Sequence, residues 1–477
     1  MKGICRVVGL LLLLGAASSA PTHAEGQSRP NIVFILVDDL EAGGLQNFPH
    51  ITNELVRQGA SFDQFFVTNS WCCPSRSSIL RSQYVHSHGV LTNTAPEGGF
   101  DRFHKTDLER STMGTWMQDA GYRTALMGKY LNHYPDKAAP ATFVPPGWDE
   151  WNVPVRRLYQ EYDYTLNENG ALRRYGWTEP DYLEDVLTGK AVDFIAKDDE
   201  KPFFLYLAPI SPHNPANSAP RHALDFPWAL APRTASFNQE DVSAEPAWLR
   251  ERPLLSQSRI DRIDEHYRAR LRAMMGVDDM VGNLVDTLRA TGRLDDTYIF
   301  FSSDNGFHLG SHRMATGKTT PFEETIKVPM VVRGPGVEPD SAVGAMGSTV
   351  DFGPTFAALA GARTPAFVEG RSLVPLLRGY EPDRWRHNAL IEFTRPENRD
   401  SGAQTPVPAY TAIRTEEYTY VQYDTGEIQL YDLDADPDQL YNLASIADPG
   451  LLMRLRTRLL MLRACSGASC RTADSYD

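Results

Sequence analysis

Five short apolar runs, rich in β-branched and aromatic residues, recur along the first two thirds of the chain. They occupy residues 31–37, 123–127, 203–207, 298–301 and 328–332. Continuous apolar runs of this length are typical of parallel strands that are covered on both faces. Longer stretches that we interpret as helices separate them, among them 267–290 and 350–360. The alternation predicts an α/β domain with a large mixed, mostly parallel sheet flanked by helices.

The pattern changes after about residue 381. Residues 388–393, 418–423 and 428–431 have the pattern of short strands joined by tight turns, and a helix is expected over 450–462. We therefore divide the mature chain into a large α/β domain, residues 25–381, and a small C-terminal subdomain, residues 382–477. The subdomain is expected to hold an antiparallel sheet plus a helix.

The first 24 residues have the features of a signal peptide. Lys2 and Arg6 precede an apolar stretch, and small residues follow it up to a cleavage site that we place after Ala24. The stretch is shorter than the roughly 20 helical residues that span a bilayer. No later segment has 18 consecutive apolar residues. We expect a secreted or periplasmic protein without a membrane span.

The net charge and the cysteine positions bear on the possible ligands and on the cellular compartment of the protein. The chain has 61 acidic and 47 basic side chains, a net charge of −14, which excludes a non-specific nucleic-acid binder with a basic face. Cys465 and Cys470 enclose four residues that can close into a disulfide in an oxidising compartment, whereas the adjacent Cys72 and Cys73 are poorly placed to bond to each other. The chain has no Asn-x-Ser/Thr acceptor, which favours a bacterial envelope.

Polar side chains follow three of the five predicted strands. They are Asp38-Asp39, Gly128-Lys129 and the segment from Ser302 to Asn305. Ligand sites in sheets of this kind form at the carboxyl ends of the strands. Asp38, Asp39, Asp304 and Asn305 offer hard oxygen donors that suit Ca²⁺ and can also accept Mg²⁺. Taken singly, each pair also fits a helix cap or a plain turn.

The segment Cys72-Cys73-Pro74-Ser75-Arg76 resembles the Cys-x-Pro-Ser-Arg motif of the sulfatase family. Further resemblances follow in the family's order along nearly the whole mature chain. They are Asp38-Asp39, Gly128-Lys129, Ser211 to Pro215 with His213, Ser303 to Gly306, Lys318, and Tyr431-Asp432-Leu433. Several stretches look closest to N-acetylglucosamine-6-sulfatases, and others to bacterial arylsulfatase-like proteins. The resemblance implies an alkaline-phosphatase-like fold.

The resemblance also implies a mechanism for hydrolysing sulfate esters. Cys72 would be oxidised to formylglycine (3-oxoalanine) by a formylglycine-generating enzyme, and one hydroxyl of the hydrated gem-diol would attack sulfur. Residue 72 would then lie with the calcium ligands Asp38, Asp39, Asp304 and Asn305, and Arg76 would help to ionise the diol. Lys129 and Lys318 would bind the sulfate, and His213 would donate a proton to the leaving oxygen.

Two departures from the family pattern stand out. Arg81-Ser82-Gln83 follows Leu80 where the family usually has Thr-Gly-Arg or Thr-Gly-Lys, in a segment that helps to present the cysteine. Leu131 takes the place of a histidine found in many sulfatases, and His133 follows two residues later as a candidate substrate contact. His86 and His88 are further candidates for lining the pocket.

The sequence is also compatible with two other functions and with several substrates. A phosphonate or phosphate monoester hydrolase of the same superfamily would have a Zn²⁺ pair with several histidines, for which His308 and His312 are the candidates. A non-enzymatic sulfoglycan-binding protein would leave Cys72 unconverted. The predicted substrate is a sulfated sugar, such as N-acetylglucosamine-6-sulfate or a glycosaminoglycan, or an aryl sulfate. Trp148, Trp151, Tyr159 and Tyr164 are candidates for a stacking wall, and residues 214–258 for a long loop over the site.

Overall fold

A computed structural model describes residues 29–395 and 406–476 of the 477-residue chain. The predicted signal peptide, residues 1–24, lies outside the described residues. Among the described helices, none combines the length and the apolar character needed to cross a bilayer.

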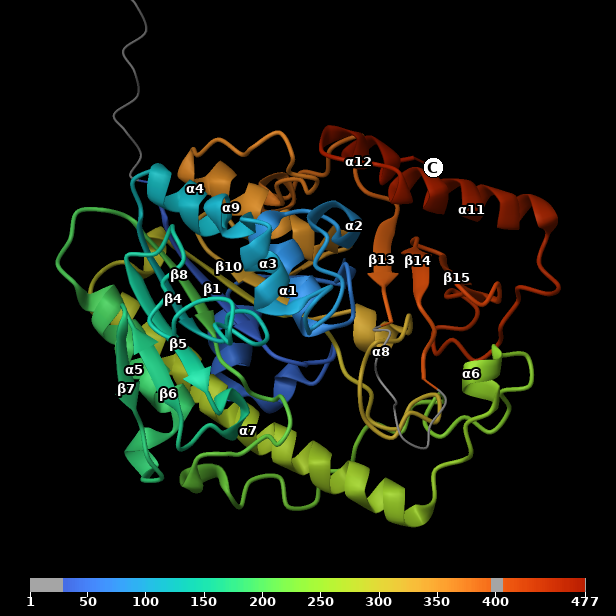
Figure 1. Ribbon diagram of the computed structural model, residues 1–477, viewed down its shortest axis with the longest axis horizontal. Coiled ribbons are helices and arrows are strands. Elements are labelled where there is room, and N and C mark those ends of the chain that lie inside the picture. The colour runs from blue at the N-terminus through green and yellow to red at the C-terminus, as the bar shows by residue number, and fades with distance from the viewer. Residues whose placement is uncertain (1–28, 396–405, 477) are drawn as a thin grey trace, which may run out of the picture.

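A ten-stranded mixed sheet forms the centre of the described molecule (Figure 1). In spatial order its strands are β11 (Ser341–Val343), β2 (Ala60–Phe62), β10 (Met330–Arg333), β9 (Thr297–Ser303), β1 (Asn31–Val37), β8 (Phe203–Ala208), β4 (Arg123–Gly128), β5 (Glu150–Arg156), β6 (Thr165–Glu168) and β7 (Ala171–Arg174). The central strands β9, β1, β8, β4 and β5 pair in parallel, and antiparallel pairings lie on either side of them. The predicted fold class is confirmed.

Helices cover both faces of this sheet. The helices that precede the C-terminal region are α1 (Cys72–Arg81), α2 (Val85–His88), α3 (Gly99–Lys105), α4 (Met113–Asp119), α5 (Leu183–Ala196), α6 (Ala247–Arg250), α7 (Gln257–Ala290), α8 (Glu323–Ile326), α9 (Phe352–Ala360) and α10 (Val374–Leu377), of which α6 and α8 lie beside the C-terminal sheet. In Figure 1, α7 runs along one side of the sheet and α1, α4 and α9 lie on the other.

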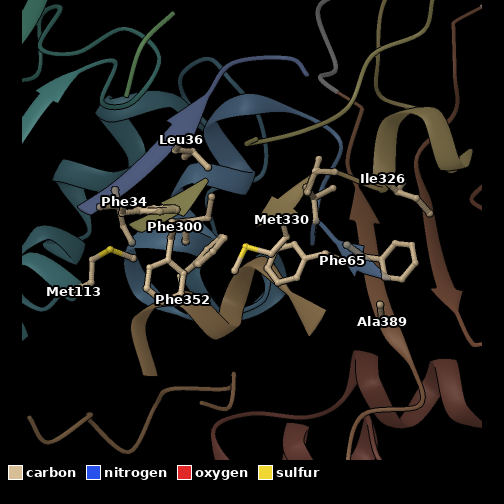
Figure 2. Close-up of a cluster of buried hydrophobic side chains, with 14 of the residues drawn as sticks. Phe34, Leu36, Phe65, Met113, Phe300, Ile326, Met330, Phe352 and Ala389 are labelled. Carbon is tan, nitrogen blue, oxygen red and sulfur yellow. The ribbon is translucent and has the colours of Figure 1, made fainter. Parts of the chain in front are cut away.

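The side chains of β1 show how the two layers are held to the sheet. Ile32, Phe34 and Leu36 point into a core shared with α1, α4 and α9, whereas the alternate residues Val33 and Ile35 point into a core shared with α5 and α7. Figure 2 shows Phe34 beside Phe352 of α9, and their ring centroids lie 4.6 Å apart. All seven residues of β1 are buried, which explains its unbroken apolar run.

The five strands predicted from apolar runs are all present. One of them, β10, begins at Met330 and pairs antiparallel to β9. Helix α7 begins ten residues before the predicted residue 267, and the helix predicted from residue 350 starts as a short 3-10 turn, Thr349–Asp351, before α9. The prediction missed β5, β6 and β7 because they lack an unbroken apolar run, and every residue of β7 is exposed.

The C-terminal region forms a separate four-stranded antiparallel sheet. Its strands are β13 (Ala389–Phe393), β14 (Tyr410–Arg414), β15 (Tyr418–Tyr423) and β16 (Ile428–Asp432), and α11 (Pro449–Arg463) and α12 (Ala468–Ala473) follow. The prediction missed β14, which separates β13 from β15. A two-stranded pairing of β3 (Phe65–Phe66) with β12 (Gly347–Ser348) completes the strands. The boundary near residue 381 stays a prediction.

Two features fix the C-terminal region in place. Cys465 and Cys470 form the predicted disulfide at the junction of α11 and α12. The buried guanidinium of Arg386 pairs with both Asp351, at the start of α9, and Asp474, near the end of the chain. A buried cation held by two carboxylates ties the small sheet to the large domain.

Candidate active site

The carboxyl ends of β1 and β9 bring two acidic segments together. Val37 lies opposite Ser303 in the parallel register, so Asp38-Asp39 and Asp304-Asn305 leave the sheet side by side. Carboxylate oxygens of Asp38, Asp39 and Asp304 all lie within 4.8 Å of one another. The structure therefore brings the predicted metal-ligating residues to one point at the edge of the sheet.

The acidic cluster has the donor set of a hard-cation site. Asp39 adopts a left-handed backbone conformation with φ of 69°, and its amide donates to Asp304. The side-chain amide of Asn305 donates to Asp39 at 2.7 Å, while its oxygen Oδ1 is buried without a hydrogen-bond partner among the described residues. A buried acceptor of this kind requires a partner. Three carboxylates and one free amide oxygen fit Ca²⁺.

Three cationic side chains surround this cluster. Lys129 Nζ lies 2.5 Å from Asp38 Oδ2, Lys318 pairs with Asp39, and Arg76 Nε lies 2.7 Å from Asp304 Oδ2. Burial alone would raise the pKa of Asp38 and Asp39, but the neighbouring ammonium groups more than offset this and hold the pKa of each carboxyl below its usual value. Asp38 and Asp39 are therefore ionised, as a cation site requires.

Cys72 begins helix α1 at the centre of this arrangement. Its Sγ lies 2.6 Å from Lys318 Nζ, 3.6 Å from Asp38 Oδ1 and 3.9 Å from Asp39 Oδ1. The residue is 1% exposed, and burial raises the pKa of its thiol to about 12. The unmodified side chain is thus a protonated thiol at neutral pH and a poor nucleophile. Ser75, one turn later, fixes the helix to the cluster by donating to the Asp304 carbonyl at 2.5 Å.

His213 reaches the cluster from the segment that follows β8. Its Nε2 lies 3.7 Å from Asp39 Oδ2, and its Nδ1 lies 2.7 Å from the Asn214 carbonyl, to which it donates. The ring stacks on Tyr159 with centroids 4.2 Å apart. Tyr159 also lies over Lys129, whose Nζ is 5.2 Å from the ring centroid. These contacts leave Nε2 as the histidine nitrogen that faces the acidic cluster.

Residues 30–362 match the sulfatase family model, and residues 310–464 match the model described as N-sulphoglucosamine sulphohydrolase, C-terminal. The chain belongs to the sulfatase family. Human N-acetylglucosamine-6-sulfatase is 34% identical, in an alignment that covers 99% of this chain and 91% of the human protein. The chain is therefore a sulfuric ester hydrolase.

Two solved structures place this sulfatase among related folds. A protein solved in complex with its substrate D-glucosamine-2-N,6-O-disulfate has a TM-score of 0.77 and 25% identity, and covers 91% of this chain and 97% of its own. The phosphonate monoester hydrolase of Agrobacterium radiobacter has a TM-score of 0.73 and 22% identity, covering 91% of this chain and 96% of its own. The second likeness shows the fold alone.

Several predicted site residues of the sulfatase lie elsewhere. His86 contacts Glu392 and the Cys465 carbonyl, and His88 contacts Ser78, so neither lines the acidic cluster. His133 is exposed and lines a cavity that adjoins the site through Tyr159, so its contact with substrate stays a prediction. His308 contacts Ser311 and Thr320, and His312 contacts Gln239 and stacks on Phe322, so both are occupied away from Asp304.

The predicted aromatic wall is largely core. Trp148, Trp151 and Tyr164 are buried within the sheet layers, and of the four predicted residues Tyr159 is the one that contacts His213. The segment 214–258 is long and mostly irregular, as predicted. Its hydrogen bonds reach His312 and the Leu440 carbonyl, so it borders the loop after β9 and the C-terminal region.

Three buried charged residues that contact the segments carrying the sulfatase site were not predicted from the sequence. Glu161 and Glu184 are buried, and the hydroxyl of Ser211 lies 3.3 Å from Glu161 Oε1 and 2.8 Å from Glu184 Oε1. Burial raises the pKa of both carboxyls, and the neighbouring charge of Glu184 raises the pKa of Glu161 further. Arg270 of α7 donates to the Asp39 carbonyl at 2.6 Å. These residues are far apart in the chain and form no motif, so only the fold reveals them.

The departure at Arg81-Ser82-Gln83 has a structural counterpart. Ser82 follows the last residue of α1 with φ of 52° and ψ of 42°, the left-handed conformation that glycine adopts most readily. Arg81 is anchored by donating to the Ser111 carbonyl at 2.6 Å and to Gln83 at 3.0 Å. The helix therefore ends where the family's glycine would end it, with a serine in a conformation that is costly for it.

Proposed function

We propose that this sulfatase hydrolyses the 6-O-sulfate of glucosamine residues in sulfated glycans, with formylglycine at position 72 and Ca²⁺ held by Asp38, Asp39, Asp304 and Asn305. The observation that carries the proposal is the position of Cys72. Its Sγ lies within 4 Å of two carboxylates and a lysine ammonium, so a nucleophile at this position meets both the cation site and a sulfate-binding cation.

The surrounding side chains suit a sulfate monoanion. Formylglycine, when hydrated, supplies a hydroxyl nucleophile, and Ca²⁺ supplies positive charge beside it. Lys129 and Lys318 place two ammonium groups around the position where sulfate oxygens would lie. His213 presents Nε2 to the same space and can hold the proton for the departing sugar oxygen. Arg76 stays bound to Asp304 and holds that ligand in place.

Two similarities support a glucosamine substrate. Human N-acetylglucosamine-6-sulfatase aligns with almost the whole chain, and a similar protein from Bacteroides thetaiotaomicron carries the name N-acetylglucosamine-6-O-sulfatase. A structural neighbour was solved with a disulfated glucosamine as its substrate. The position of the sulfate on the sugar and the class of sugar are carried over from these proteins as part of the proposal.

The proposal includes export and maturation. The sequence of residues 1–24, the disulfide Cys465–Cys470 and the names of relatives described as extracellular sulfatases support a secreted or periplasmic protein. A formylglycine-generating enzyme is the partner required during maturation. A bacterial source stays a prediction from the absence of Asn-x-Ser/Thr acceptors.

The decisive experiment combines mass analysis with a panel of substrates. In active protein the peptide that contains residue 72 should be about 18 Da lighter than its thiol form, because conversion replaces CH₂SH with CHO. Cys72→Ala should abolish turnover, whereas the matched Cys73→Ala should retain most of it. Removing Ca²⁺ with a chelator should stop turnover, and adding it back should restore it.

The panel should hold N-acetylglucosamine-6-sulfate, galactose-6-sulfate, an aryl sulfate and a phenyl phosphonate. We expect the highest kcat/KM for the glucosamine substrate. Full activity in protein whose Cys72 is entirely thiol would contradict the formylglycine assignment. Preference for the phosphonate would contradict the substrate class.

A further inference from the structure

A second hollow adjoins the sulfate site and shares Tyr159 with it. Its volume is about 550 Å³, and it is lined by residues 130–134, residues 153–160 and Trp177. Tyr159 stacks on His213 and lies over Lys129 on one side, and its hydroxyl accepts from Asn132 of the hollow at 3.0 Å. One aromatic side chain therefore separates the hollow from the proposed catalytic groups.

The charge of this hollow is opposite to that of the molecule. The chain carries a net charge of −14, yet the described lining contains the cations Arg156 and Arg157 and the exposed His133, with no carboxylate among its residues. Arg157 pairs with Asp163. The side chain of Arg156 is exposed and forms no ion pair or hydrogen bond with the part of the chain that the structure describes, although its backbone pairs with Thr165 in the sheet. A free guanidinium in a hollow without acids favours an anionic ligand.

The rim of the hollow offers a flat apolar surface. Trp177 is 67% exposed, although tryptophan is usually well buried. Its ring lies nearly parallel to that of Tyr162, at an interplanar angle of 10° and with the ring centroids 6.3 Å apart. Tryptophan beside a cation is suited to bind a sugar ring that carries a negative substituent.

We propose that this hollow is a second subsite that binds an additional anionic substituent of a sulfated glycan, with Arg156 contacting the anion and Trp177 contacting the sugar. The inference rests on the proposed function of the neighbouring sulfate site and extends it. The anion is a sulfate or carboxylate, either on the sugar that loses its 6-O-sulfate or on the next sugar. Because the molecule as a whole repels polyanions, local cations are needed to hold such a chain at the site.

The test compares substrates that share the 6-O-sulfate and differ in a second anion. N-acetylglucosamine-6-sulfate has none, glucosamine-2-N,6-O-disulfate has an N-sulfate, and a uronic acid linked to N-acetylglucosamine-6-sulfate has a carboxylate on the next sugar. Arg156→Ala should lower kcat/KM about tenfold for one or both of the substrates with a second anion, and by less than about twofold for N-acetylglucosamine-6-sulfate. Arg156→Glu should lower it further, and higher salt should shrink the differences.

Arg173→Glu is the matched control, because Arg173 is an exposed arginine of β7 on the same edge and does not line the hollow. It should leave all three substrates nearly unchanged. A loss confined to the N-sulfated sugar places the anion on the same sugar, and a loss confined to the disaccharide places it on the next one. Equal effects of Arg156→Glu and Arg173→Glu, or equal losses on all three substrates, overturn the proposal.

Binding can be measured separately from turnover. Calorimetry with Cys72→Ala protein and glucosamine-2-N,6-O-disulfate or the disaccharide should show that Arg156→Ala weakens binding of the anion-bearing probe about tenfold. Release of no sulfate by the wild-type protein would refute the proposed function while leaving this measurement valid. Unchanged affinity for both probes would overturn the subsite itself.

Discussion

Two contacts determine which ring nitrogen of His213 faces the acidic cluster. Nδ1–H donates a hydrogen bond to the Asn214 backbone carbonyl, and stacking on Tyr159 fixes the plane of the ring. A proton that leaves the ring toward the acidic cluster must therefore leave from Nε2. From this position Nε2 can serve the departing oxygen or hold the sulfate group, and the two roles differ in how turnover depends on the leaving group.

Replacing His213 with alanine tests this role. A sugar alkoxide needs a proton as the S–O bond breaks, whereas a nitrophenolate leaves nearly unaided. We expect kcat for N-acetylglucosamine-6-sulfate to fall about 10²–10⁴-fold and kcat for nitrophenyl sulfate to fall clearly less. His133→Ala serves as the control and should show no such difference between leaving groups. Equal losses on both substrates would assign His213 to sulfate binding and leave Lys318 as the candidate proton donor.

Helix α1 begins with Cys72 at the acidic cluster and ends inside the core. All ten of its residues are buried, and it stops at Ser82 in the left-handed conformation. The hydroxyl of Ser82 is buried without a hydrogen-bond partner among the described residues. Both features cost stability, the first through backbone strain and the second through desolvation.

Ser82→Gly should therefore stabilise the protein, although glycine usually destabilises a chain. We expect the free energy of unfolding to rise by about 1 kcal/mol, since glycine removes both the strain and the unpaired hydroxyl. Denaturant unfolding followed by fluorescence would measure it. Ser77→Gly, in the interior of the same helix, should lower the free energy of unfolding instead. A loss of stability in Ser82→Gly as large as in Ser77→Gly would contradict the strain argument.

The strands that could be predicted from the sequence are those whose burial produces an unbroken run of apolar residues. β1, β8 and β9 are buried along their full length and show as unbroken apolar runs. β7 is exposed and β14 has no unbroken apolar run, so neither shows this pattern. Each forms a strand because it pairs with a neighbouring strand. The motif residues of the site were likewise predictable, because most of them follow a strand or lie in the first turn of α1, and Lys318 was identified through the family resemblance. Glu161, Glu184 and Arg270 were not, because tertiary packing alone brings them to the site.

Across the whole molecule, the segment before α6 is tied to the C-terminal sheet through a buried carboxyl. Glu245 accepts from Gln429 Nε2 and from the Tyr431 hydroxyl, both at 2.6 Å. Burial raises the pKa of Glu245 to about 7. The folded protein therefore binds this proton more tightly than the unfolded chain does.

This contact makes stability depend on pH. The contribution of protonated Glu245 is fully present below the unfolded pKa of about 4.5 and is lost as pH rises through about 7. Relative to Glu245→Gln, the wild-type protein should lose about 3 kcal/mol of unfolding free energy between pH 5 and pH 8. Denaturant unfolding at several pH values measures the difference. For the control Glu240→Gln, at an exposed position, the free energy of unfolding should depend on pH as it does in the wild-type protein. The same pH dependence for Glu245→Gln would contradict the assignment.

The burial of Cys72 also has a consequence for how active molecules arise. The folded protein exposes 1% of this residue, and every residue of α1 is buried, so a modifying enzyme has no access to the thiol once the chain has folded. Under the proposed conversion, oxidation must come before folding, and the two processes compete for each newly made chain. A chain that folds first remains stable and inactive. The specific activity of a preparation would then depend on the fraction of chains that were modified before they folded. Recovering the inactive fraction would require unfolding it in denaturant and refolding it in the presence of the modifying enzyme.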